Sequence, residues 1–306
     1  MILMSTLASD NDEQTSQFNA VTNALILEIF GLLVIKKATW LHPLLKPFFR
    51  PAVTRLVKIF LAFNQDTVQR GIVKASGEFL KWFVRDVEIV GNECIPKEGP
   101  LLVVSNHPAA YDVFILVANL GRDDVKVMTT EITLIRHLPA VYAHTIPIAR
   151  DVHQRLVAMR AAIRHLQEGG ALLIFPRGDV EPDPAISNTP LAYLDKWSSS
   201  IEVFLRKVPE TKTVVSLAEG VLSPRWIRFP ILYLWRKPQV RQKIAEMFQI
   251  IQQLVGSKDI YFTPSVRFSL PLTVTELGGL DAPHGVLRDA ITQQAQALLV
   301  NRERKP

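Results

Sequence analysis

The sequence predicts an α/β fold in which a central, mostly parallel or mixed sheet is flanked by helices and preceded by an N-terminal helical segment that associates with a membrane. Two observations lead to this prediction. From residue 86 onward, short apolar runs alternate with stretches of helical periodicity, a pattern typical of a single α/β domain with a buried sheet. Residues 18–85 show helical periodicity throughout, with basic residues beside apolar ones. A chain of 306 residues is long enough to bury the large core that this fold needs.

Three parts of the chain differ in composition. Residues 1–17 are polar and without periodicity, so we expect a disordered tail. Residues 18–85 form the predicted amphipathic helical region, which prolines 43, 47 and 51 are expected to break into pieces. Residues 86–306 form the predicted α/β domain.

The helical region allows two interpretations. Val53, Val57 and Phe60 recur on one side of a helix that carries Arg55 and Lys58 elsewhere, and aromatic side chains next to cations are common at membrane interfaces. The same pattern suits helices that simply cover the core of the next domain, and the sequence favours neither. The stretch over residues 22–35 is interrupted by Glu28 and falls short of the roughly 20 apolar residues of a membrane span, so we interpret it as a buried or interfacial helix rather than a signal peptide.

In the α/β domain, short β-branched or apolar runs bounded by Gly, Pro or charged residues predict strands. These runs are VEIV, GPLLVVS, VKVMTT, HTIPIAR, GALLIFP, TKTVVSLAEG and SVRFSLPLTV. Helical spacing of apolar residues predicts helices over residues 112–120, 151–168, 239–255 and 285–300.

Charge and composition restrict the partners. A net charge of +6 accompanies 48% hydrophobic residues and a mean hydropathy of +0.16. Nucleic-acid binding proteins are basic and polar, whereas this chain is basic and apolar, which favours anionic membrane lipids as partners and argues against nucleic acid. A soluble enzyme with a slightly basic surface remains an alternative. The single cysteine excludes an internal disulfide and indicates a reducing compartment.

One pair of residues, His107 and Asp112, is a candidate catalytic pair. In LLVVSNHPAAYDVFIL the strand is expected to end near Ser105 and the next helix to begin near Pro108, because proline suits a first helical turn. Inside one helix, His107 and Asp112 would point about 140° apart. With His107 on the turn and Asp112 near the helix start, the imidazole can fold back, donate to the carboxylate from one nitrogen and keep the other as an acceptor. A base without a protein nucleophile implies that the substrate supplies the nucleophile, most simply a hydroxyl in an acyl transfer.

At this point the sequence resembles the glycerolipid acyltransferases, the family of glycerol-3-phosphate and lysophosphatidic acid acyltransferases. Their first motif, Asn-His with an aspartate five residues after the histidine, is intact here as Asn106, His107 and Asp112. The other family motifs follow in order over residues 86–220, and VRFSLPL resembles the family's closing strand. They are represented by Ile148 and Arg150 in IPIAR, by Phe175, Pro176, Arg177 and Gly178 in FPRGDVEP, and by Gly220 in VVSLAEG.

Two motifs depart from the family pattern. In the third motif Arg177 stands where the family has Glu, and Asp179, Val180 and Glu181 stand in place of the usual Thr-Arg-Ser type. In the fourth motif Val215 stands where the family has Pro. Arg177 either contacts a phosphate or pairs with Asp179 or Glu181 and stiffens the loop; the second is favoured because exposed charges close in sequence usually satisfy each other.

The resemblance implies a function and a set of roles. His107 acts as general base on an acceptor hydroxyl, Asp112 orients it, and Arg150 with Asn106, the third-motif residues and Gly220 binds the acceptor. The acyl donor is acyl-CoA or acyl-carrier protein, with no further cofactor and no metal. We expect the enzyme at the cytoplasmic face of a membrane, peripheral or shallowly inserted. The alternatives are a catalytically silent lipid-binding relative and a thioesterase that uses the same pair on water. Acyl length, acyl carrier, acceptor identity and oligomeric state do not follow from the sequence.

Overall fold

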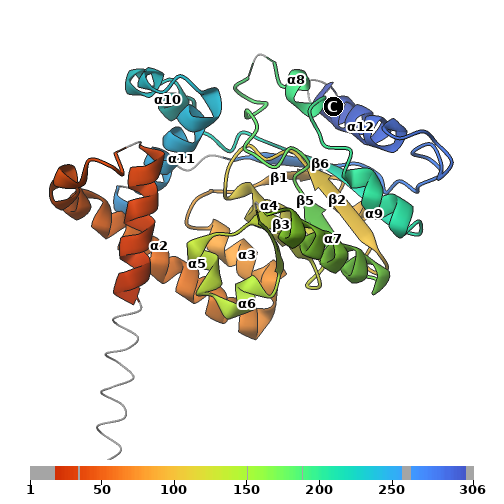
Figure 1. The fold of residues 1–306 in the computed structure, drawn as a ribbon, viewed down its shortest axis with the longest axis horizontal. Helices are drawn as coiled ribbons and strands as arrows, with labels where there is room; N and C mark the ends of the chain where they lie inside the picture. The colour runs from red at the N-terminus through yellow and green to blue at the C-terminus, as the bar shows by residue number, and fades with distance from the viewer. Residues whose placement is uncertain (1–17, 34, 150, 188, 257–262, 301–306) are drawn as a thin grey trace, which may run out of the picture.

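The computed structural model describes residues 18–33, 35–149, 151–187, 189–256 and 263–300 (Figure 1). The expected tail, residues 1–17, lies outside the described residues. The strands form one sheet in the order β1-β7-β6-β2-β5-β3-β4. Neighbouring strands run parallel, except that β6 and β7 are antiparallel. The strands are Glu88–Val90 (β1), Leu101–Ser105 (β2), Lys126–Thr130 (β3), Thr145–Ile148 (β4), Ala171–Ile174 (β5), Lys212–Glu219 (β6) and Ser265–Phe268 (β7).

The predicted fold class is confirmed: a mixed, mostly parallel sheet is flanked by helices. The longer helices are residues 18–32, His42–Arg70 (α2), Ile72–Leu80 (α3), Asp112–Leu120 (α4), Val152–Gln167 (α7), Ile201–Lys207 (α9), Pro238–Val255 (α11) and Val286–Val300 (α12). The short ones are Thr39–Leu41 (η1), Asn92–Cys94 (η2), Thr133–Arg136 (α5), Pro139–Tyr142 (α6), Leu191–Leu194 (α8), Pro224–Ile227 (α10) and Pro230–Leu234 (η3).

The core lies on both faces of the sheet. Alternate residues of a strand point to opposite faces, so Leu101 and Val103 of β2 pack with α2, α3 and α4, whereas Leu102 and Val104 pack with α7, α9 and α12. Every residue of β2 is buried, which explains its continuous apolar run. A smaller cluster joins the helix over residues 18–32 to η3 and α11.

Helix α2 corrects the expectation that prolines break the N-terminal region. It runs without interruption from His42 to Arg70 and contains Pro47 and Pro51. Pro43 lies in its first turn, where the missing N–H costs nothing. The three prolines recur every four residues and all are exposed, so the carbonyl groups that lose a hydrogen bond face water.

The apolar face of α2 is turned toward the protein. Val53 and Val57 are buried in the same core cluster as Phe79 and Phe83 of the following segment. Of the two interpretations of residues 18–85, this face therefore fits helices that cover the core. The exposed apolar side chains lie elsewhere: Trp40 is 78% exposed, Leu44 74% and Phe48 65%. None of the helices in the described part of the chain has the length and apolarity needed to span a bilayer.

Candidate active site

The site lies where β2 ends, beside the ends of its parallel neighbours β5 and β6. Asn106 follows β2 directly, and its side-chain amide forms two hydrogen bonds with the backbone of Ala218 on β6, each of 2.8 Å. The side chain is buried and in effect extends the pairing of the two strands by one residue. Asn106 was expected among the substrate-binding residues. Its amide oxygen and nitrogen instead bond to the main chain, and they fix the direction in which the chain leaves the sheet.

His107 and Asp112 meet as expected from the sequence. His107 Nδ1 lies 2.9 Å from Asp112 Oδ1 and 3.1 Å from Oδ2. An ionised carboxylate only accepts hydrogen bonds, so Nδ1 carries the hydrogen and Nε2 of the neutral ring is an acceptor. No described residue forms a hydrogen bond with Nε2. The Asp112 side chain is fully buried, whereas that of His107 is 22% exposed.

The helix after this turn starts at Asp112, in agreement with the helical spacing over residues 112–120. The expected start near Pro108 is wrong, because the residues from Pro108 to Tyr111 form a turn. The Asp112 carboxylate accepts the N–H of Ala109 in that turn, at 3.0 Å. One carboxylate therefore holds both the imidazole and the backbone that carries it.

The third-motif loop packs against the imidazole. The ring of Phe175 stacks on His107, with centroids 4.3 Å apart. The buried Pro176 and a turn follow, closed by the hydrogen bond from Gly178 N–H to the Phe175 carbonyl at 3.0 Å. Gly178 has a φ of 69° in this turn, a conformation that favours glycine. The loop thus fixes one face of the ring.

Arg177 stiffens this loop, though not through the expected partners. Its Nη1 donates to the Val180 carbonyl at 2.6 Å, and its guanidinium lies 4.9 Å from the centre of the Tyr193 ring. Asp179 pairs with Lys243 instead, at 2.7 Å. The expected pairing of Arg177 with Asp179 or Glu181 is absent from the ion pairs of the described residues.

Two acidic residues that the sequence did not single out as site residues anchor the same loop. The N–H of Glu181 donates to the carbonyl of His107 at 2.7 Å, and the Glu181 carboxylate accepts the indole N–H of Trp197 at 3.1 Å. Asp183 accepts four backbone N–H groups, from Ala185 and from Gly220 to Leu222 beyond β6. Gly220 takes part through its backbone, with a φ of 70°.

Side chains of helix α11 bond to the turn after His107 and to the loop that contains Glu181. Gln242, Glu246 and Gln249 are buried although polar, and their spacing places them on one face of the helix. Gln242 donates to the carbonyls of Pro108, at 2.6 Å, and Glu181, at 2.5 Å. Glu246 accepts the N–H of Ala110 at 2.6 Å. These residues were not predicted from the sequence, because their only signal is the recurrence of Gln and Glu at helical spacing.

The acidic surroundings set the proton affinity of the imidazole. Burial lowers the pKa of His107, but the charge and hydrogen bond of Asp112, helped by Glu246 and Glu181, outweigh burial and leave this pKa above its ordinary value. Burial also raises the pKa of Glu181 to about 8 and that of Glu246 to about 7. Groups that take up and release protons near neutral pH therefore gather around His107.

An apolar cavity opens beside the imidazole. Its volume is about 350 Å³. His107 and Phe175 lie at one part of its wall, together with Tyr111 and Ala110. The rest of the lining is mainly apolar and comes from α2, α3, α4 and β3, with Phe60, Phe63, Phe79, Phe114, Val113, Val117 and Val127 among its members. We call this space the apolar cavity.

One expected residue lies outside the described part of the chain, namely Arg150. Ile148 is the last residue of β4, and two strands, β5 and β3, lie between β4 and β2. Among the described residues, no group of three or more His, Cys, Asp and Glu side chains is arranged to hold a metal ion.

Comparison with known proteins assigns part of the chain. Residues 86–219 match the family model described as Acyltransferase. Among solved structures, the chain is similar to PlsC, a 1-acyl-sn-glycerophosphate (LPA) acyltransferase from Thermotoga maritima, with 14% sequence identity and a TM-score of 0.48. That match covers 76% of this chain and 79% of the other. A search of the curated proteins finds no match.

Proposed function

We propose that this protein, whose residues 86–219 match the acyltransferase family model, transfers a fatty acyl group from a thioester to the hydroxyl of a glycerolipid-like acceptor, with His107 as the general base. The observation that carries the proposal is the pair of His107 and Asp112, 2.9 Å apart, at the wall of a cavity lined by apolar side chains.

The geometry supports a specific division of roles. As the acceptor oxygen attacks the thioester carbonyl, Nε2 of His107 takes the hydroxyl proton, and the C–S bond then breaks. The departing sulfur receives that proton from the imidazolium, so the products are an ester and a free thiol. Asp112 holds the ring with Nδ1–H toward itself and stabilises the positive charge that the ring acquires. Base catalysis of this kind contributes about 10²- to 10⁴-fold to the rate.

The apolar cavity is the natural place for the acyl chain. It adjoins His107, so a chain inside it brings the thioester carbonyl to the imidazole. Each buried methylene group contributes about 0.8 kcal/mol to binding. The acyl carrier, CoA or acyl-carrier protein, stays outside the cavity in this proposal.

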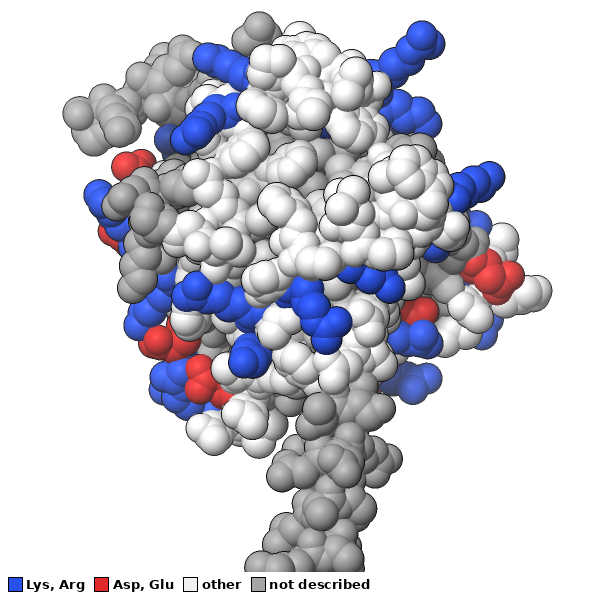
Figure 2. All heavy atoms as spheres, turned by 90° about the vertical axis from the view of Figure 1, so that its left-hand side faces the viewer, with Lys and Arg blue, Asp and Glu red and all other residues white. Residues whose placement is uncertain are grey.

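We also propose that the enzyme works at the surface of a membrane, on its cytoplasmic side. Figure 2 shows a face with few Asp or Glu side chains and with Lys and Arg around a wide uncharged area. Exposed apolar side chains come from the start of α2 and from the region of η3, where Leu234 is 76% exposed. One apolar cluster joins η3 to the helix over residues 18–32. Such a surface suits shallow contact with anionic lipids.

The experiment follows free thiol released from acyl-CoA by the purified full chain, with and without a lysophospholipid or glycerol 3-phosphate acceptor. Acyl transfer requires release that depends on the acceptor and falls by about 10²-fold or more in His107→Gln. His153→Gln removes an exposed imidazole from α7 and is the matched control. Release without acceptor indicates a thioesterase, and no release with any acceptor indicates a silent lipid-binding protein; either result overturns the proposal.

Membrane contact has its own test. The double variant Leu44→Ser with Phe48→Ser removes two exposed apolar side chains, and we expect it to float less with vesicles that contain phosphatidylglycerol. Val157→Ser, which removes an apolar side chain that is 63% exposed on α7, is the control. Equal flotation of both variants and the wild type would refute the proposed contact surface.

A further inference from the structure

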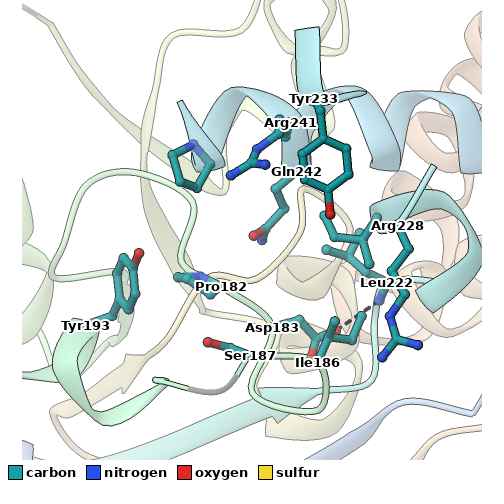
Figure 3. A pocket seen from close by; sticks show the side chains of 12 residues that line it. Pro182, Asp183, Ile186, Ser187, Tyr193, Leu222, Arg228, Tyr233, Arg241 and Gln242 are labelled. Carbon is teal, nitrogen blue, oxygen red and sulfur yellow. Dashed lines mark hydrogen bonds between the residues drawn. The ribbon is translucent and has the colours of Figure 1, made fainter. Parts of the chain in front are cut away.

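A second cavity lies beside the loop that follows Glu181. Its volume is about 380 Å³. Polar side chains from three parts of the chain line it: Arg228 and Tyr233 near α10 and η3, Arg241 on α11, and Ser187 in the loop. Figure 3 shows Arg241 and Tyr233 on one side of this space, Ser187 opposite, and Arg228 at one end. We call it the arginine pocket.

The two arginines carry positive charge that the described residues leave unpaired. Neither Arg228 nor Arg241 takes part in an ion pair within the described part of the chain. The guanidinium of Arg241 stacks over the ring of Tyr233, 5.1 Å from its centre, which restricts its motion. At the far end, Tyr193 has Arg177 and Lys196 near its ring, each at 4.9 Å.

The acid in the pocket wall is already engaged by the backbone. Asp183 is buried, and its two oxygens already accept N–H groups from Ala185, Gly220, Val221 and Leu222. Burial raises the pKa of this carboxyl, so its negative charge is disfavoured relative to an exposed aspartate. Asp183 serves the backbone, whereas both guanidinium groups remain available.

We propose that the arginine pocket binds a phosphate group, either from a lipid headgroup or from a soluble phosphorylated compound. Guanidinium groups match phosphate oxygens in pairs and bind them by charge-assisted hydrogen bonds. The hydroxyl groups of Tyr233 and Ser187 add donors of the kind that phosphate oxygens accept. The exposed Arg228 and Tyr233 leave the pocket open to the surface.

The pocket is a site of its own. His107 does not line it, and Arg228 and Arg241 both lie beyond the segment that matches the acyltransferase family. Its wall adjoins the loops around His107 through Gln242, which donates to the carbonyls of Pro108 and Glu181, and through Pro182, which follows Glu181. Phosphate binding here does not depend on the proposed acyl transfer, so each is tested without the other.

The test is titration calorimetry of the full chain with inorganic phosphate and with glycerol 3-phosphate at constant ionic strength. We expect saturable binding that weakens about tenfold or more in Arg241→Gln and in Arg228→Gln. The double variant is expected to abolish this binding. Arg225→Gln removes the same charge from an exposed position of α10 that does not line the pocket, and is the control. His107→Gln is expected to bind like the wild type.

A competition experiment identifies the source of the phosphate. Vesicles of equal parts phosphatidylcholine and phosphatidic acid displace bound glycerol 3-phosphate if a lipid headgroup enters the pocket. If they leave it bound, the ligand is a soluble phosphorylated compound. Absence of saturable phosphate binding, or unchanged affinity in a folded double variant with wild-type thermal stability, would overturn the proposal.

Discussion

The apolar cavity and the arginine pocket lie on either side of one loop system and differ in almost every property. The first is walled by aromatic and aliphatic side chains of α2, α3 and α4, and it reaches His107. The second has arginine, tyrosine and serine side chains in its wall beside apolar ones, and His107 does not line it. The contrast teaches that the two spaces suit different ligand chemistry: the space next to the base suits a hydrocarbon chain, whereas the arginine pocket suits an anionic group.

The loops between the two spaces depend on α11. Gln242 and Glu246 from that helix hold the turn after His107 and the backbone at Glu181. Substitutions in the apolar cavity are therefore expected to change acyl selectivity, and substitutions in the arginine pocket to change phosphate affinity. Substitutions in the loops themselves are expected to change turnover.

The largest expected effect is the loss of turnover when Asp112 is changed. Asp112→Asn leaves an amide where the carboxylate now accepts from Nδ1–H, which disfavours the required tautomer and removes the charge that stabilises the imidazolium. We expect kcat to fall by about 10³-fold while phosphate binding is unchanged. Steady-state kinetics at saturating donor measures this, with the exposed Asp289→Asn of α12 as control. A loss of less than tenfold would remove Asp112 from the mechanism.

A smaller effect is expected from narrowing the apolar cavity. Val113 lines it from α4, and Val113→Phe takes up space that the acyl chain otherwise fills. Each methylene group displaced lowers kcat/KM by about fourfold, so the preference moves to shorter donors. A series of acyl-CoA chain lengths measures the shift, and Val157→Phe on the surface of α7 is the control. An unchanged preference would mean that the chain binds elsewhere.

A third effect concerns stability rather than turnover. Glu246 has its pKa raised from 4.5 to about 7 in the folded protein. Between these values the folded state holds a proton that the unfolded state has lost, so stability falls as pH rises from 4.5 to 7. The free energy of unfolding falls by about 3 kcal/mol over this range. His107, with its raised pKa, contributes in the same direction.

Glu246→Gln isolates the share of this one group. The amide keeps an acceptor for the N–H of Ala110 and does not titrate, so the decline of the melting temperature with pH becomes shallower by a few degrees. Thermal unfolding at several pH values measures it, with the exposed Glu210→Gln as control. Identical pH dependence in the wild type and Glu246→Gln would mean that Glu246 is ionised throughout.

The sequence was most informative where local pattern decides structure. The buried run before Asn106 reads as a strand because apolar side chains fill both faces of the sheet, and the five-residue spacing to Asp112 places the pair on a turn and a helix start. The prediction that Pro47 and Pro51 break the helix was wrong. They lie on the exposed face, where carbonyl groups that lack a helical hydrogen bond face water, and periodicity does not reveal this. Gln242 and Glu246 could not be assigned because their partners lie more than a hundred residues away or on another loop. The position of Arg177 follows from its contact with the Tyr193 ring, which lies 16 residues away in the sequence and is not visible in the local pattern.

The central claim is that His107 removes the proton of the acceptor hydroxyl, and the pH dependence of kcat/KM tests it most directly. Only the neutral imidazole acts as a base, and its pKa is raised by Asp112 and the nearby glutamates. We therefore predict that kcat/KM rises with pH through a midpoint above 6.5, the ordinary value for histidine, and that the residual activity of His107→Gln lacks this rise. A wild-type profile that is flat over this range, or the same rise in His107→Gln, would contradict the account.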